Sequence, residues 1–247
     1  MLELDLWLEI AKSAALEGGN YLLQNQGKEL KVLMDSGRDI KLQLDTDTEK
    51  LIKESLSLQS SFSILGEETG LSNNLGEFYW VVDPLDGTSN FLRDIPISCV
   101  SIALMQDVTP ILGVIYDFNH DDLYFGHQNS KAFLNQNEIT VSDYSKKNQS
   151  TLVTGIPAKT HYSDEEFKNM INDFQDWKKV RMIGSAAMAA IYVAAGKAET
   201  YKENGIFLWD IAAGAAIVEA AGGVASIKNI QADYRVDAIF TNQHLAN

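Results

Sequence analysis

The chain has 247 residues, a length that fits one large domain or two small ones, and its composition of 45% hydrophobic and 22% charged residues is that of an ordinary globular protein. The formal net charge of −14 argues against non-specific binding to nucleic acid or to an anionic membrane. It does not exclude a phosphorylated substrate, because bound metal ions can invert the local field.

The N-terminal residues and the cysteine content of the chain bear on where in the cell the protein is found. No apolar run reaches membrane-spanning length, and the N-terminus is an acidic helical pattern without the basic segment of a signal peptide. The single Cys99 can form no internal disulfide, which favours a reducing environment. We therefore expect a cytoplasmic protein.

The first half of the chain predicts two helices followed by a series of short strands. Apolar residues recur at helical spacing from Trp7 to Leu22, with Gly27 as a stop, and a second helix is predicted over residues 45–58. Alternating or apolar runs bounded by turn residues then predict strands at residues 62–65, 78–82, 100–104, 113–116, 123–125, 132–135 and 139–141.

The second half is richer in buried helices. Residues 163–174 predict a surface helix capped by Ser163, whereas residues 184–196 and 210–221 are Ala-rich and apolar nearly all round, which is typical of helices enclosed between layers. Strands are predicted at residues 199–203, 224–227 and 238–241. This pattern favours a layered α+β or α/β sandwich, treated as a single domain over residues 1–247 with an N-terminal half to about residue 145 and a C-terminal half over residues 146–247.

Acidic side chains lie beside turn signals, at the ends of apolar segments. Carboxylates are rarely buried without a partner, and these segments contain no lysine or arginine to neutralise them. Divalent cations that prefer oxygen ligands are the natural counter-charge. The sequence therefore predicts a metal site built from Asp45, Glu67, Asp83, Asp86 and Asp210.

Residues 83–88 (DPLDGT) carry the strongest signal. Proline fixes one φ angle and Gly87 permits a sharp turn, so that Asp83 and Asp86 can face one point with the Leu85 carbonyl between them. Thr88 then begins a helix whose free N–H groups suit a phosphate. A solvated Asp-Gly turn is the simpler interpretation, but it does not explain the whole segment after a buried strand.

The other acidic residues also have simpler interpretations. Glu67 alone fits a surface turn, and Asp45 and Asp210 fit helix N-caps, although a capping aspartate keeps lone pairs for a metal. An EF-hand is excluded, because the loop that starts at Asp117 has aspartate at its sixth position and glutamine at its twelfth. The sequence also lacks a zinc-type histidine pattern, a Gly-x-Ser-x-Gly elbow and a Walker loop.

Taken together, these segments resemble the inositol monophosphatase family of metal-dependent, lithium-sensitive phosphatases. The resemblance covers the chain from the first helix to about Asn242 and is carried by residues 66–68 (GEE), 83–91 (DPLDGTSNF) and 209–214 (WDIAAG), with support from 184–187 (GSAA), 203–205 (ENG) and 219–223 (EAAGG). It implies a layered α/β/α/β/α sandwich that is usually a homodimer, and a cofactor of two Mg²⁺ ions with a weaker third.

The resemblance also implies ligands for these ions. The first Mg²⁺ would be held by Glu67, Asp83 and the Leu85 carbonyl. The second would be held by Asp83, Asp86 and Asp210, and Glu67 would also serve the third. Many relatives carry His-Gly soon after residues 90–91, where this chain has Arg93-Asp94, but no implied ligand is lost. A second phosphate, a partner subunit and a surface carboxylate are the alternative partners of Arg93, and of these we expect the surface carboxylate.

Roles in catalysis and substrate binding follow from the same resemblance. Thr88, paired with Asp45, would orient the attacking water, and Glu67 would serve catalysis through its metal. Backbone N–H groups of Gly87 and Thr88 would contact the phosphate. Ser185 and Ala186 would line the wall of the same pocket, and Glu203 would contact the substrate hydroxyls.

The family hydrolyses several phosphate esters, and the residues after Gly87-Thr88 narrow the choice. Ser89-Asn90-Phe91 favours the inositol or sugar phosphatase branch over 3′-phosphoadenosine 5′-phosphate nucleotidases, which typically carry Lys-Glu-Phe there. Inositol-1-phosphate is our first expectation and fructose-1,6-bisphosphate the second, with Arg181 or Lys202 on the second phosphate. A regulatory interaction protein is the non-enzyme alternative, against which the intact ligand set argues.

Overall fold

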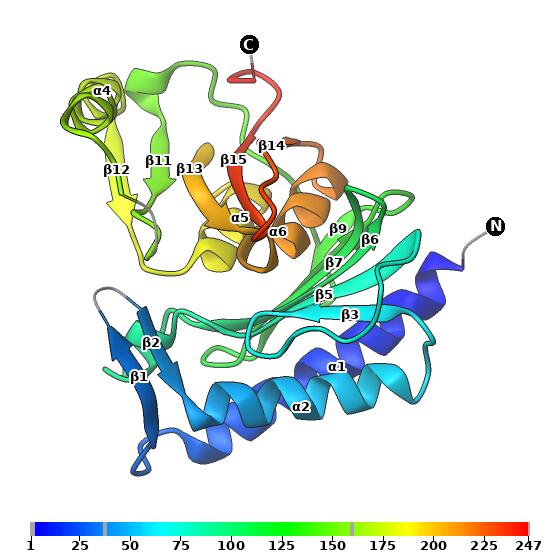
Figure 1. Cartoon of the computed structure of the whole chain (residues 1–247). Helices are drawn as coiled ribbons and strands as arrows, with labels where there is room; N and C mark the ends of the chain where they lie inside the picture. Colours follow the sequence, from blue (N-terminus) through cyan, green and yellow to red (C-terminus); the bar gives the residue numbers. More distant parts are fainter. Residues whose placement is uncertain (1–2, 37–38, 159–160, 247) are drawn as a thin grey trace.

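The computed structural model describes residues 3–36, 39–158 and 161–246 of the chain. Five layers follow one another in Figure 1: two long N-terminal helices, an eight-stranded sheet, a pair of buried helices, a five-stranded sheet and one outer helix. The predicted α/β/α/β/α sandwich is confirmed.

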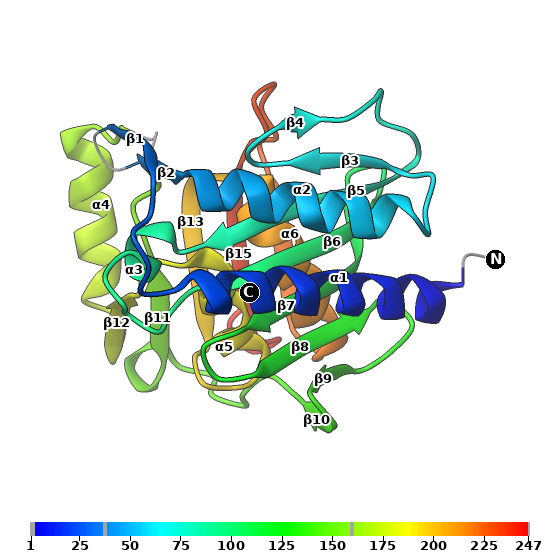
Figure 2. The same cartoon turned by 90° about the horizontal axis from the view of Figure 1, so that it is seen from below.

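The first layer consists of α1 (Leu4–Asn25) and α2 (Gln43–Ser57), which lie side by side across one face of the large sheet (Figure 2). Each helix buries one stripe, and that of α2 contains two carboxylates beside its apolar residues. A hairpin of β1 (Val32–Ser36) and β2 (Asp39–Leu42) joins the two helices. Buried acids on this stripe face the end of the sheet at which the site lies.

The eight-stranded sheet has the order β10-β9-β8-β7-β6-β5-β3-β4. All its pairings are antiparallel except that of β3 with β5, which is parallel. The C-terminal ends of β3 and β5 therefore lie at the same end of the sheet. Its strands are β3 (Ser63–Gly66), β4 (Gly70–Leu71), β5 (Phe78–Asp86), β6 (Cys99–Gln106), β7 (Thr109–Asp117), β8 (Asp122–His127), β9 (Ala132–Leu134) and β10 (Asn137–Ile139). The short helix α3 (Thr88–Phe91) follows β5 directly.

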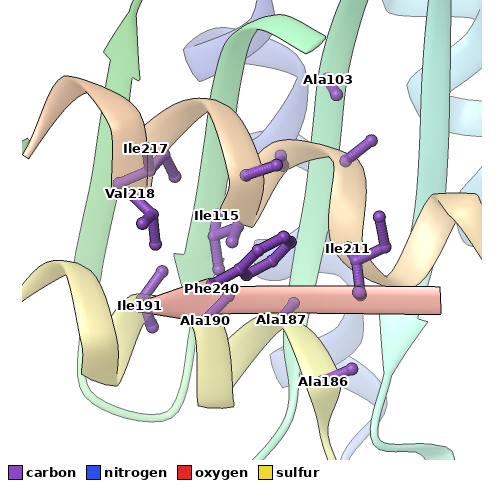
Figure 3. Close-up of a cluster of buried hydrophobic side chains, with 14 of the residues drawn as sticks. Ala103, Ile115, Ala186, Ala187, Ala190, Ile191, Ile211, Ile217, Val218 and Phe240 are labelled. Carbon is purple, nitrogen blue, oxygen red and sulfur yellow. The ribbon is translucent and has the colours of Figure 1, made fainter. Parts of the chain in front are cut away.

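The middle layer is α5 (Ala186–Ala194) and α6 (Leu208–Ala220), which are buried on nearly every side as their composition predicts. Figure 3 shows the core around them, in which Ile115 of β7, Ile217 of α6 and Phe240 of β15 belong to one buried cluster. Small alanine side chains on both helices let two sheets close on them. The N-terminal ends of both helices are thereby fixed between the two sheets.

The five-stranded sheet has the order β12-β11-β13-β15-β14 and covers the other side of the middle layer (Figure 1). Its strands are β11 (Thr151–Thr154), β12 (Lys179–Met182), β13 (Thr200–Phe207), β14 (Val224–Lys228) and β15 (Arg235–Thr241), and a 3₁₀ turn η1 (Lys147–Gln149) precedes β11. The outer helix α4 (Asp164–Phe174) begins at Ser163, whose hydroxyl accepts from the Glu166 N–H, so the predicted cap is confirmed.

Several strands were not predicted. The missed strands are β1, β2, β4, β11 and β12. Apart from β11 they are largely polar or exposed at edges, so their sequences lack the apolar alternation that marks a half-buried strand. Within the described residues, no helix is both long and apolar enough to cross a membrane.

Candidate active site

The end of β5 carries two buried aspartates, Asp83 and Asp86, and Asp86 lines a cavity. The pairing with β6 shifts between Asp83 and Asp86, so the strand bulges at Pro84 and Leu85. The Leu85 N–H donates to Asp83 Oδ1 at 3.0 Å, which fixes that carboxylate. Gly87 follows at φ +90°, a conformation that side chains disfavour, and turns the chain into α3.

Two further carboxylates reach the same cavity from other elements. Glu67 follows β3, and its N–H donates to the Val82 carbonyl at 3.1 Å, which places it beside Asp83. Asp210 lies in the first turn of α6, where its Oδ2 accepts from the Phe207 N–H at 3.3 Å. The N-cap of this helix is Phe207, so the N-cap interpretation of Asp210 is wrong by three residues, although the carboxylate still binds the helix end.

The carboxylates form a compact acidic cluster. Ligand oxygens of Asp83, Asp86 and Asp210 all lie within 4.8 Å of one another. Glu67 lines a cavity of about 360 Å³ together with Asp86 and Asp210, and its charge adds to the effect of burial in raising the pKa of Asp83. Among the described residues that line this cavity, none is a lysine, arginine or histidine. An all-oxygen donor set of this charge fits a hard divalent cation.

Burial and mutual repulsion act on these groups in the metal-free protein. Burial raises the pKa of Glu67 to about 8, with the Glu68 charge adding to the effect, and raises that of Asp86 to about 6. The pKa values of Asp83 and Asp210 are raised well above their ordinary range by burial and by the neighbouring Glu67 charge. The cluster therefore holds protons when it holds no cation, and protons and metal compete for it.

The C-terminal half of the chain anchors Asp86. Ser185, the N-cap of α5, donates from Oγ to Asp86 Oδ2 at 2.5 Å, and the Ala187 N–H donates to the same oxygen at 2.7 Å. Both bonds lower the pKa of Asp86 against the effect of burial. These two bonds to one oxygen fix the direction of the Asp86 carboxylate, which lines the cavity.

Asp45 and Thr88 come from different elements, and of the two only Thr88 lines the cavity. Asp45 is buried in the first turn of α2, where its Oδ2 accepts from the Leu42 N–H at 2.8 Å; the helix begins two residues earlier than predicted, so Asp45 is not its N-cap. Its charge adds to the high pKa of Glu67. The Thr88 hydroxyl donates to the Leu85 carbonyl at 3.1 Å. Their pairing around a water stays a prediction.

The remaining predicted pocket residues all line the cavity. The backbone turn at Gly87 and Thr88 forms one side, and the start of α5 at Ser185 and Ala186 forms another. Glu203 of β13 closes the cavity with a side chain that is only 8% exposed. Burial and the Asp86 charge raise the pKa of Glu203 to about 8. A largely buried carboxyl at this place is suited to hydrogen bonds with ligand hydroxyls.

Two residues near the cluster were not predicted. The Lys41 ammonium binds both carboxylate oxygens of Glu68 at 3.1 Å and lines a smaller cavity with Glu67 and Asp210. Glu49 is fully buried in α2 and accepts from backbone N–H groups just after Glu67. The i, i+4 spacing of Asp45 and Glu49 on an otherwise apolar stripe was the signal that could have found it.

Comparisons with known proteins place this site in a family. The model of the "Inositol monophosphatase family" matches residues 3–239. The "Nus factor SuhB" of Xylella fastidiosa is 38% identical over 87% of this chain and 80% of its own length. The "Inositol-1-monophosphatase" of Synechocystis is 35% identical over 91% of this chain and 79% of its own length. The solved inositol monophosphatase of Anabaena superposes with a TM-score of 0.83 at 34% identity, covering 98% of this chain and 92% of that structure.

The layered fold, the acidic cluster and these matches define a metal-dependent phosphoric monoester hydrolase. The chain belongs to the inositol monophosphatase family. The resemblance that residues 66–68, 83–91 and 209–214 carry in the sequence is therefore confirmed.

Proposed function

We propose that the enzyme hydrolyses inositol-1-phosphate or a closely similar polyol or sugar phosphate with Mg²⁺ as its metal. The observation that carries this proposal is the position of Glu203, which lines the same cavity as the acidic cluster. A polyol ester presents its phosphate and its hydroxyl groups to such a cavity at the same time. Glu203 supplies the acceptor that these hydroxyls need once the phosphate is at the cluster.

The four carboxylates and one carbonyl divide into two overlapping ligand sets. We propose that Glu67, Asp83 and the Leu85 carbonyl hold one ion, that Asp83, Asp86 and Asp210 hold another, and that Glu67 serves a weaker third. When bound, Mg²⁺ supplies positive charge that activates water and stabilises the phosphate oxygens and the leaving alkoxide. The site supports this division because Asp83 has a ligand oxygen within 4.8 Å of those of Asp86 and Asp210 and also feels the charge of Glu67.

The protein's own groups then position the reactants. Thr88, together with Asp45, orients the attacking water, and the backbone N–H groups of Gly87 and Thr88 contact the phosphate. The N-terminal ends of α5 and α6 lie at the cavity, where their partial positive charge favours a bound phosphate. Ser185 and Ala186 shape the wall beside the sugar or polyol ring.

The bisphosphate alternative has weaker support. The Lys202 ammonium lies 3.8 Å from Asp173 and lines a second cavity, under α4, and Arg181 is exposed on β12. Lys202 therefore lines a cavity other than the one that contains the acidic cluster, which weakens its case as the partner of a second phosphate. The Nus factor name of one relative favours a regulatory role as a second candidate, in which binding a protein partner accompanies or replaces hydrolysis.

Phosphate release from a substrate panel tests the proposal. Inositol-1-phosphate, fructose-1,6-bisphosphate and 3′-phosphoadenosine 5′-phosphate are each assayed with Mg²⁺, with EDTA, and with Mg²⁺ plus Li⁺. We expect Mg²⁺-dependent release that is fastest for inositol-1-phosphate and inhibited by Li⁺. Absence of release from all three esters by folded, Mg²⁺-bound protein would favour the regulatory role.

Two controls make this assay specific. Asp83→Asn removes a carboxylate from the cluster, whereas Asp176→Asn makes the same change at an exposed position. Only the first is expected to lose activity. Sedimentation of the same preparation tests the expected homodimer, and fractionation of cells tests the expected cytoplasmic location.

A further inference from the structure

One buried carboxylate next to the active site has no place in the ligand sets above. Glu49 has no exposed surface, although it is an acidic residue, and it lies on α2, which supplies none of the ligands proposed above. Burial of a carboxylate is costly unless it is paired and hydrogen-bonded. The partners of Glu49 therefore indicate what this residue does.

These partners all belong to the turn that carries Glu67 or to the adjacent helix surface. Glu49 Oε2 accepts from the Glu68 N–H at 2.7 Å, and Oε1 accepts from the Thr69 N–H at 3.0 Å and from the Thr69 hydroxyl at 2.5 Å. The Lys53 ammonium, one helical turn along α2, lies 3.2 Å from Oε1 and also donates to the Gly70 carbonyl. The carboxylate thus ties two consecutive backbone amides to the helix.

The turn is shaped to receive this side chain. A Cβ on Gly66 would lie 2.4 Å from the Glu49 carboxyl carbon, so only glycine leaves room for the close approach. On the other side of Glu67, its own N–H is held by the Val82 carbonyl at 3.1 Å. The backbone is therefore fixed on both sides of the Glu67 side chain: the sheet holds the N–H of Glu67 itself, and Glu49 holds the N–H groups of the next two residues.

We propose that Glu49 is a positioning residue that holds the turn at residues 66–69 and so keeps the Glu67 carboxylate on the acidic cluster. This inference rests on the proposed role of Glu67 as a metal ligand. A turn that is fixed in the metal-free protein spares the ion the entropic cost of ordering it, and groups of this kind typically change metal affinity by roughly 10–100-fold.

Glu49→Gln tests the proposal, because glutamine has nearly the same shape but its amide nitrogen cannot accept from a backbone N–H. Two readouts avoid turnover altogether: Mg²⁺ titration calorimetry, and hydrogen exchange of the Glu68 and Thr69 amides in EDTA. We expect the variant to bind its weakest Mg²⁺ roughly tenfold less tightly. We also expect both amides to exchange faster without metal.

Matched variants separate positioning from general stability. Glu54→Gln makes the same change at an exposed site of α2, and Ile52→Val weakens the packing of the buried stripe without touching the turn. Thr69→Val, a milder change at an exposed residue, removes one of the bonds to Glu49 and is expected to act in the same direction as Glu49→Gln. The two control variants, Glu54→Gln and Ile52→Val, are expected to leave Mg²⁺ affinity and amide exchange in the turn unchanged.

The proposal is overturned if Glu49→Gln binds Mg²⁺ like the wild type, or if Ile52→Val loses as much affinity at an equal loss of stability. Failure of the proposed function would look different. If Glu67 does not bind metal, Glu67→Gln leaves Mg²⁺ affinity unchanged, while Glu49→Gln still speeds exchange of the two amides.

Discussion

The Ser185 hydroxyl donates to Asp86 Oδ2 at 2.5 Å and thereby joins the two halves of the chain at the active site. The same oxygen of Ser185 caps α5 by accepting from the Met188 N–H at 3.2 Å. One side chain therefore fixes both the start of a buried helix and the direction of an acidic residue 99 positions away in sequence.

Ser185→Ala should weaken both functions of this side chain. Loss of the cap is expected to cost about 1 kcal/mol of stability. Loss of the bond to Asp86 removes an interaction that lowers its pKa, so protons compete better for the site and Mg²⁺ affinity should fall roughly tenfold. Thermal unfolding and Mg²⁺ calorimetry measure the two effects. A variant with normal Mg²⁺ affinity would show that Ser185 acts only as a cap.

Asp83→Asn should abolish activity and leave a folded protein. A ligand oxygen of Asp83 lies within 4.8 Å of those of Asp86 and Asp210, so its loss removes several kcal/mol of charge stabilisation and turnover should fall by at least about a thousandfold. In EDTA at high pH the variant should resist urea better than the wild type, because one repelling charge is gone. Near-normal turnover, or a metal-free variant less stable than the wild type at pH 9, would contradict this prediction.

Metal-free stability should fall as pH rises. Burial raises the pKa of both Glu67 and Glu203 from 4.5 to about 8, so between these values the folded state binds more protons than the unfolded state. The free energy of unfolding therefore decreases as pH rises through this window. The stabilisation from these protons is fully lost above about pH 8. Urea unfolding in EDTA at pH 5.5 and 8.5 measures the trend.

Two comparisons sharpen the pH experiment. Glu203→Gln removes one of the groups with a raised pKa and should reduce the loss between the two pH values. Saturating Mg²⁺ should reverse the trend, because deprotonation of the cluster favours metal binding. Greater stability of the metal-free wild type at pH 8.5 than at pH 5.5 would refute the prediction.

Asn90→Ala should loosen the loop after α3 from the C-terminal half. The Asn90 amide donates to the carbonyls of Ile97 and Ile183, each at 2.8 Å, so the substitution leaves two carbonyl groups without this donor. We expect a loss of about 1–3 kcal/mol in urea unfolding. The neighbouring Ser89→Ala, at an exposed position, is the control and should change stability by less than about 0.5 kcal/mol.

Local signals in the sequence predicted enclosed helices and a sharp turn between two aspartates, whereas the five-layer order and the ligand set were implied by the resemblance to the family. The apolar composition of α5 and α6 predicted enclosed helices, and residues 83–88 combine a buried strand with a sharp turn. Each signal is contained in one segment and does not depend on what packs against it.

The elements that were missed depend on contacts between distant segments. Glu49 is explained only by amides 19 and 20 residues further along the chain, and β12 is a strand only because β11 lies beside it. The start of α2 was misplaced because an aspartate in the first turn can bind the helix end as a cap does. The spacing of Asp45 and Glu49 marks a buried acid locally, but the partners that explain it lie too far along the chain for a local pattern.

The acidic cluster also has a consequence for the amount of protein in a cell. A ligand that binds only the folded state lowers the unfolded fraction, and proteases act on that fraction. Carboxylates that repel one another without a cation make the metal-free chain the more easily degraded form. Under magnesium starvation the steady-state level of this enzyme should therefore decline along with its catalytic rate, and its half-life should lengthen again when magnesium returns.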